Sequence, residues 1–129
     1  MTSSFALSQA ELAGIAQQHA SLRAAVDAGE LWMDADVAER AAARCDQAVQ
    51  ELEKWLNNAR VLTEKRKFGA NEDGEAAAQA FAQAGREYLA TIKDAQQVIK
   101  NMAVTFRAAG RTVTEADDAS RQRFRDAAE

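Results

Sequence analysis

Residues 77–116 read AAQAFAQAGREYLATIKDAQQVIKNMAVTFRAAGRTVTEA, and this stretch decides the fold. Apolar residues recur along it in alternating steps of three and four: Ala77, Phe81, Ala84, Tyr88, Ile92, Ala95, Ile99, Met102, Phe106, Ala109, Val113 and Ala116. This heptad spacing places all of them on one narrow seam of a helix. No proline interrupts the stretch, so we predict a rod of about 45 residues, roughly 70 Å long. Such a rod cannot bury its seam alone and needs a partner helix.

The residues before this stretch predict that partner. Asp34 is a suitable N-cap, and the following helix carries its own apolar seam: Val37, Ala41, Cys45, Ala48, Leu52, Trp55, Ala59 and Leu62. We predict about 33 residues of helix, closed by Lys65, Arg66 and Lys67, whose charges suit a helix C-terminus. Asn71 or Asp73 would then cap the third helix. Two long amphipathic helices joined by a turn at 68–74 must lie antiparallel.

A shorter helix precedes this pair. Ser8 and Glu11 form a capping box, and the apolar stripe Leu12, Ile15, His19, Leu22 and Val26 ends at Gly29, a residue typical of helix C-termini. We therefore predict an all-α fold: residues 1–33 as an N-terminal helix and linker, and residues 34–129 as a long antiparallel helical hairpin that forms bundles. The first helix either covers an overhang of the third or folds back as a third bundle member. A bend at Gly110, with Thr114 and Asp117 re-capping the helix, is also expected.

Composition narrows the class of function. The 129 residues contain no proline and one cysteine, and their formal charge is −4. A mildly acidic chain argues against nucleic acid as the main partner, and a single cysteine excludes an intrachain disulfide. No apolar run is long enough to cross a bilayer, and no stretch has the succession of regions that a cleavable signal peptide has. We expect no membrane span and, if the protein leaves the cell, a route without a cleavable leader.

The sequence offers little for catalysis or for metal binding. His19 is the only histidine and lies on an apolar stripe, so we interpret it as a partner-facing or hydrogen-bonded core residue. Cys45 lies on the seam of the second helix, where a small apolar role is the simplest interpretation. The acidic residues Glu72, Asp73 and Glu75 lack the spacing of a calcium loop and suit a helix N-terminus. We predict no enzyme activity, no metal and no cofactor.

The hairpin and its C-terminal end resemble the WxG superfamily and related substrates of type VII (ESX) secretion in actinobacteria. Many members carry a Tyr-x-x-x-Asp/Glu export motif after the hairpin, and the corresponding residues here are Val113 and Asp117, within Arg111-Thr-Val-Thr-Glu-Ala-Asp-Asp-Ala119. The family's Trp-x-Gly turn has Phe68-Gly69 in its place. The resemblance implies helical hairpins that pair as four-helix bundles, and a protein either secreted without a cleavable signal peptide or cytoplasmic before export.

Apolar residues off the seams are candidates for partner contact. They are Leu56, Val61, Leu89 and Val98, together with Trp32 in the linker, which is either a buried hinge plug, the simpler interpretation, or an exposed anchor. We expect a non-enzymatic protein–protein interaction module that acts as a type VII substrate, co-secreted partner or targeting subunit. Its partner would be a second hairpin in a homo- or heterodimer, a secretion ATPase or a toxin. The alternative is a cytoplasmic, self-assembling helical-bundle protein with a structural or adaptor role.

Overall fold

The computed structural model describes residues 4–64 and 67–128, and the side chains of 7–64, 67–111 and 118–127. Its elements are α1 (Ser4–Asp27), α2 (Ala35–Ala59), the short 3-10 helix η1 (Arg60–Thr63) and α3 (Glu72–Ala128). No strand occurs in these ranges. The predicted all-α class is therefore confirmed.

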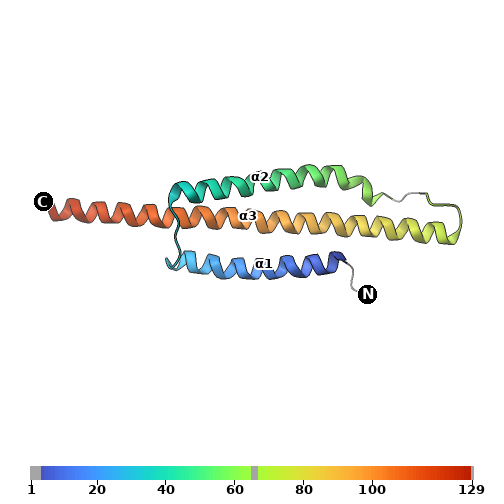
Figure 1. Ribbon diagram of the computed structural model, residues 1–129, viewed down its shortest axis with the longest axis horizontal. Helices are drawn as coiled ribbons and strands as arrows, with labels where there is room; N and C mark the ends of the chain where they lie inside the picture. The colour runs from blue at the N-terminus through green and yellow to red at the C-terminus, as the bar shows by residue number, and fades with distance from the viewer. Residues whose placement is uncertain (1–3, 65–66, 129) are drawn as a thin grey trace.

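The helices are arranged around α3, which lies between the other two (Figure 1). α2 runs antiparallel to α3 along one flank, and α1 runs parallel to α3 along the other. Within the described residues, α1 and α2 do not contact each other. Of the two placements left open by the sequence, α1 folds back along α3 and leaves the C-terminal part of α3 bare. The three helices consequently form an open arrangement rather than a closed bundle.

Local sequence signals account for several helix boundaries. Gly29 adopts a φ of 74°, which glycine reaches without strain, and its N–H donates to the Val26 carbonyl at 3.0 Å. The Asp34 carboxylate accepts from the backbone N–H of Asp36 at 2.9 Å and so caps α2. The Asn71 side chain accepts from the N–H of Gly74 at 2.7 Å and caps α3. The predicted stop and both predicted caps are thus confirmed, with Asn71 chosen over Asp73.

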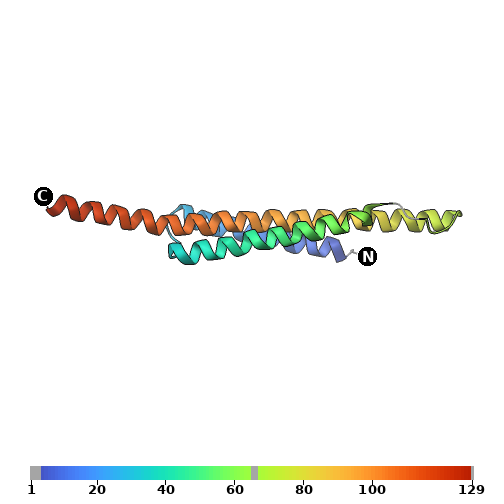
Figure 2. The same ribbon diagram turned by 90° about the horizontal axis from the view of Figure 1, so that it is seen from above.

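Three other boundary predictions were wrong. α1 already begins at Ser4, so Ser8 lies inside the helix and is no N-cap. α2 ends at Ala59 and passes into η1, which makes it shorter than predicted. α3 continues as one helix through Gly110 (Figure 2), so the helix does not restart there; the side chains of Thr114 and Asp117, predicted to re-cap it, lie outside the described part of the structure. Gly110 serves close packing instead: a Cβ placed there would lie 2.8 Å from Cβ of Ala38.

The buried faces differ in phase from the predicted seams. On α2 the buried residues are Ala38, Ala42 and Leu56, whereas Trp55, predicted to lie on the seam, is 60% exposed. On α3 the seam residues Ile92 and Ala109 are buried as predicted, whereas Phe81 is 65% exposed. Four further residues are buried outside the predicted seam: Ala78, Ala82, Gln96 and Ala103. The reason is that α3 has neighbours on two flanks, so its buried band is wider than a heptad seam.

The core is thin and built largely of alanine. The chain exposes 9431 Å², whereas a compact monomer of its 14.0 kDa mass is expected to expose about 6,700 Å². Part of the difference reflects the elongated shape, which Figures 1 and 2 show from two sides. The molecule therefore has ample uncovered surface for association with other chains.

Candidate functional site

The candidate site lies along the first part of α3, before the level at which α1 begins. The His19 side chain meets Thr105 across the α1–α3 interface, and the two helices run parallel. At equal rise per residue, Ser4 is then level with about residue 90 of α3. Beyond that level, at residues 72–89, no described helix covers the α1 flank of α3. The covered flank thus continues directly into an uncovered one.

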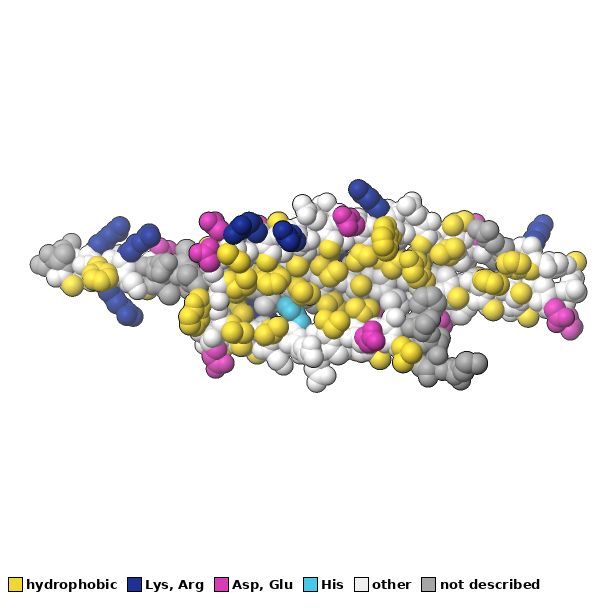
Figure 3. All heavy atoms as spheres, in the orientation of Figure 1, with side chains coloured by type: hydrophobic (Ala, Val, Ile, Leu, Met, Phe, Trp, Pro, Cys, Tyr) yellow, Lys and Arg dark blue, Asp and Glu magenta, His cyan; other side chains and the backbone are white. Residues whose placement is uncertain are grey.

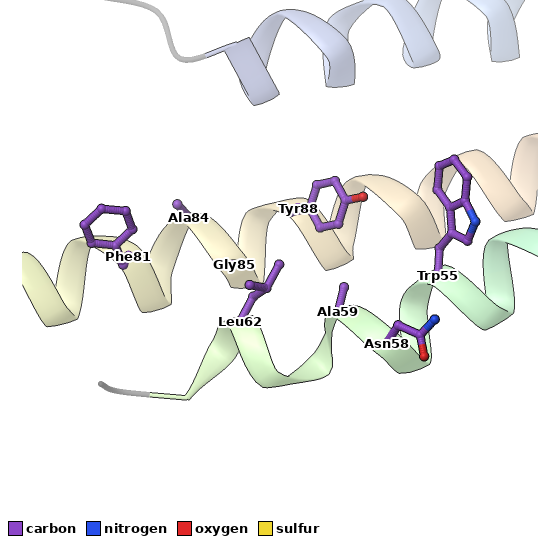
Figure 4. A pocket seen from close by; sticks show the side chains of 8 residues that line it. All are labelled: Trp55, Asn58, Ala59, Leu62, Phe81, Ala84, Gly85 and Tyr88. Atoms are coloured by element: carbon purple, nitrogen blue, oxygen red, sulfur yellow. The ribbon is translucent and has the colours of Figure 1, made fainter. Parts of the chain in front are cut away.

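An apolar groove lies beside this uncovered flank, on the side of α3 that faces α2 and η1. It is formed where the end of α2 and η1 meet α3, it has a volume of about 480 Å³, and its lining residues are Trp55, Asn58, Ala59, Leu62, Phe81, Ala84, Gly85 and Tyr88. Figure 4 shows Trp55 from α2 at one end of the groove, Tyr88 at its centre and Phe81 at the other end. Figure 3 shows that apolar side chains also run along the face between α1 and α2. We call the eight residues the apolar groove.

The walls of the apolar groove are held by close packing. A Cβ atom on Gly85 would lie 2.6 Å from the Leu62 carbonyl carbon, so only glycine lets η1 approach α3 this closely. At the far end, the rings of Phe68 and Phe81 stack with their centroids 5.3 Å apart. Aromatic pairs at such distances add to the burial of their area. The turn after η1 is thereby tied to α3, and the groove keeps a defined shape.

Polar contacts fix α2 against α3 next to the groove. Gln96 is buried, and its Nε2 donates to the Val49 carbonyl at 3.2 Å and to the Glu53 carboxylate at 3.0 Å. Further along, Arg107 donates to Glu39 at 3.1 Å and to Asp46 at 2.8 Å. The hydrogen bond from Arg107 holds the pKa of Glu39 below its ordinary value of 4.5. These contacts set the register between the helices, and hence the position of the groove.

His19 has a structural role in the described arrangement. The Thr105 hydroxyl donates its single proton to the Asn101 carbonyl at 3.1 Å, so it accepts from Nε2 of His19 at 2.8 Å. The histidine is half-buried between α1 and α3. It therefore matches the hydrogen-bonded core histidine expected from its place on the apolar stripe.

The residues predicted for partner contact lie in different environments. Leu56 is only 3% exposed, so its prediction was wrong: its side chain packs in the α2–α3 interface and is not available to a partner. Val61 is exposed on η1, and Leu89 and Val98 are half-buried on α3. Trp32 is 64% exposed, which makes the hinge-plug interpretation wrong. The structure does not bring these residues together into one surface.

The apolar groove was missed because its main residues were assigned to the seams. Trp55, Leu62, Phe81, Ala84 and Tyr88 all have seam spacing, and a residue on a seam is expected to be buried. One signal was available: the two seams carry bulky aromatic residues near the turn but mainly alanine and aliphatic residues elsewhere. Where two helices pack closely through alanines, little room is left between them for large side chains on the same seams.

Other candidate groups show no sign of a reactive centre. Cys45 is half-buried, and burial raises the pKa of its thiol, which lowers its reactivity. Among the described residues, no three His, Cys, Asp or Glu side chains cluster as metal ligands would. None of the described helices has an apolar run of the length and purity that a membrane span requires.

The second unusual feature is the end of α3. Beyond Gly110, which packs against Ala38 of α2, residues 111–128 project without a neighbouring helix (Figure 1). We call residues 111–128 the C-terminal extension. It carries Phe124, which is 78% exposed. The side chains of Val113 and Asp117, the export-motif-like residues, lie outside the described part of the structure.

Comparisons of the chain with protein-family models, with curated proteins and with solved structures found no match.

Proposed function

We propose that this protein is a non-enzymatic helical interaction module of a type VII (ESX) secretion pathway, acting as a substrate, a co-secreted partner or a targeting subunit. The observation that carries the interaction role is the apolar groove beside a helix flank that no described helix covers. The pathway is supported by the resemblance around Val113 and Asp117. In this proposal the protein leaves an actinobacterial cell without a cleavable signal peptide.

The geometry suits binding to another helix rather than to a small molecule. The apolar groove is open and elongated along α3, and its lining is mostly aromatic and aliphatic. An amphipathic helix placed in such a groove buries apolar side chains at intervals of three and four residues. A helical hairpin of a partner, a toxin or a subunit of the secretion ATPase complex would present such a helix.

The test is export. The protein, tagged internally in a surface turn, is expressed in an actinobacterium and followed in cell lysate and culture medium. Expected is its appearance in the medium, lost on deletion of the secretion ATPase, with a cytoplasmic enzyme as lysis control. Equal amounts in the medium of parent and deletion strain would refute the secretion proposal.

The motif is tested with two substitutions. Asp117→Ala should abolish export or binding to the secretion machinery, because the proposal assigns this carboxylate to recognition, while Val113→Tyr should strengthen export. Asp117→Ala should change the free energy of unfolding by no more than about 0.5 kcal/mol, as is usual for surface positions. An Asp117→Ala variant that melts early but is exported normally would assign the residue to folding instead.

A further inference from the structure

We infer that the apolar groove is a binding site for the C-terminal extension of a second copy of this chain, so that copies join head to tail. The apolar groove is formed by α2, η1 and the first part of α3, and the C-terminal extension is the other end of α3, at the opposite end of the molecule. The contact is homotypic and does not depend on the secretion proposal. It concerns two features that the fold itself leaves uncovered.

The groove continues an interface that the molecule already has. α1 packs on one flank of α3 and runs parallel to it, and past the start of α1 the same flank becomes the open region beside residues 72–89. A helix entering there, parallel to α3, would extend the line of α1. An antiparallel helix from a second copy would instead bring the body of that copy against α1. The parallel direction is therefore the one that fits.

The lengths agree in this parallel orientation. Phe124 lies about 13 residues beyond Arg111, the first residue of the C-terminal extension, a distance of roughly 20 Å along the helix. Gly85, in the middle of the apolar groove, lies about 13 residues beyond Glu72, where α3 begins. If the packed part of the second copy, which ends at the level of its residue 110, just meets the start of α3 in the first copy, Phe124 of the second copy is level with Gly85 of the first copy.

The chemistry agrees as well. Phe124 is an aromatic side chain that contacts solvent in one copy, and beside Gly85 the apolar groove offers Phe81, 65% exposed, and Leu62, 45% exposed, to receive it. In the same register, Arg111 of the second copy is level with Glu72 and Asp73 in the acidic first turn of α3. Opposite charges there favour the parallel register.

The expected affinity is modest. A helix of about 18 residues, with one face covered by α3, α2 and η1, buries on the order of 1,200 Å² in total, at the lower end of standard interfaces. Because the two contacting surfaces differ, the contact is heterologous, and a parallel translation does not close on itself. We therefore expect open, concentration-dependent chains of copies rather than one closed dimer.

The test uses two complementary variants of the full chain. Phe124→Ser removes the inserted side chain, and Phe81→Gln alters the groove at the level where Phe124 is placed. In sedimentation velocity over a concentration series, each variant alone should remain monomeric, with association weakened by about 30-fold or more, the effect of losing a central anchor. An equimolar mixture should form a 1:1 complex and nothing larger, because only one intact pair of surfaces is left.

Leu22→Ser is the matched control, since Leu22 is also an exposed apolar side chain but lies on α1, away from both surfaces. It should associate like the parent, and circular dichroism should show unchanged melting of all three variants. A parent that stays monomeric at millimolar concentration would overturn the inference. So would association that persists in Phe124→Ser, or a mixture of the two variants that fails to form the complex.

Discussion

Replacing glycine by alanine should lower the free energy of unfolding at Gly85 and raise it at Gly14. The contrast between the two variants tests how η1 packs on α3. A Cβ on Gly85 would lie 2.6 Å from the Leu62 carbonyl carbon and 3.0 Å from the Leu62 Cβ. Carbon atoms in ordinary contact are about 3.5–4.0 Å apart. Gly85→Ala therefore requires η1 to move by roughly 1 Å. A Cβ on Gly14, inside α1, would meet nothing within 4 Å.

The magnitudes follow from two opposing effects. Alanine is favoured over glycine in a helix interior by about 1 kcal/mol. Overpacking costs typically about 1–3 kcal/mol, and the upper end applies at Gly85 because the obstructing atoms belong to the backbone. We expect Gly85→Ala to lower the free energy of unfolding by about 1–2 kcal/mol, or roughly 4–8 °C in melting temperature. Gly14→Ala should raise the free energy of unfolding by up to about 1 kcal/mol.

The assay is thermal and urea unfolding of both variants beside the parent, followed by circular dichroism at 222 nm. The reasoning fails if Gly85→Ala stabilises the protein as much as Gly14→Ala does. That result would mean that η1 does not lie against α3, and the apolar groove would lose one of its walls.

Two further predictions concern the polar contacts between α2 and α3. Gln96→Ala should lower the free energy of unfolding in urea by about 1–2 kcal/mol, because its buried amide loses two hydrogen bonds, to the Val49 carbonyl and to the Glu53 carboxylate. Gln97→Ala, at an exposed position, should change the free energy of unfolding by less than about 0.5 kcal/mol. Similar losses in the two variants would place Gln96 at the surface. Arg107 lowers the pKa of the Glu39 carboxyl in the folded protein. Their contact therefore stabilises the fold fully at a pH above the pKa of this carboxyl in the unfolded chain. The stabilisation is lost as the pH falls through the lower pKa of the folded protein. Arg107→Gln should therefore flatten the decline of melting temperature from pH 5 to pH 3, while Arg40→Gln should leave it steep; an unchanged slope in Arg107→Gln would contradict this assignment.

Three signals that act within a few residues were read correctly from the sequence, although the capping box at Ser8 was not. The Asp34 cap, the Asn71 cap and the left-handed Gly29 each depend on one side chain and its nearest backbone groups. Such contacts are specified by residue type and spacing alone. Predictions that needed a distant neighbour were less successful, as the length of α2 and the interpretation of Gly110 show.

Gly110 illustrates the difference. Within the helix alone, a glycine costs stability and suggests a bend. In the structure it is buried beneath the first turn of α2, with Ala35 and Ala38 as neighbours. The reason for glycine is therefore a close helix–helix approach, and this depends on which residues of α2 are level with it. A periodic pattern carries no information on that register.

The candidate site escaped prediction for a related reason. A heptad pattern identifies a face that packs somewhere along a helix, but not where the neighbouring helix ends. Phe81 has seam spacing and is nevertheless exposed, because α1 begins only at the level of about residue 90 of α3. The apolar groove is thus a product of unequal helix lengths. Adjacent Leu56 is buried in place of Trp55, a shift of one residue that changes which face of α2 is available.

The C-terminal extension is involved in both proposals, recognition for secretion and self-association, and the two uses of this helix exclude each other. No described helix packs on residues 111–128, so the fold itself does not explain the exposed Phe124. An exposed aromatic side chain on the C-terminal extension is better explained by a contact with another molecule. If the extension of one copy lies in the apolar groove of the next, the segment containing Val113 and Asp117 is shielded by that copy. A secretion partner that reads this segment would have to displace it, so association and export would compete for the same helix, and only copies with an unoccupied extension would be available for recognition.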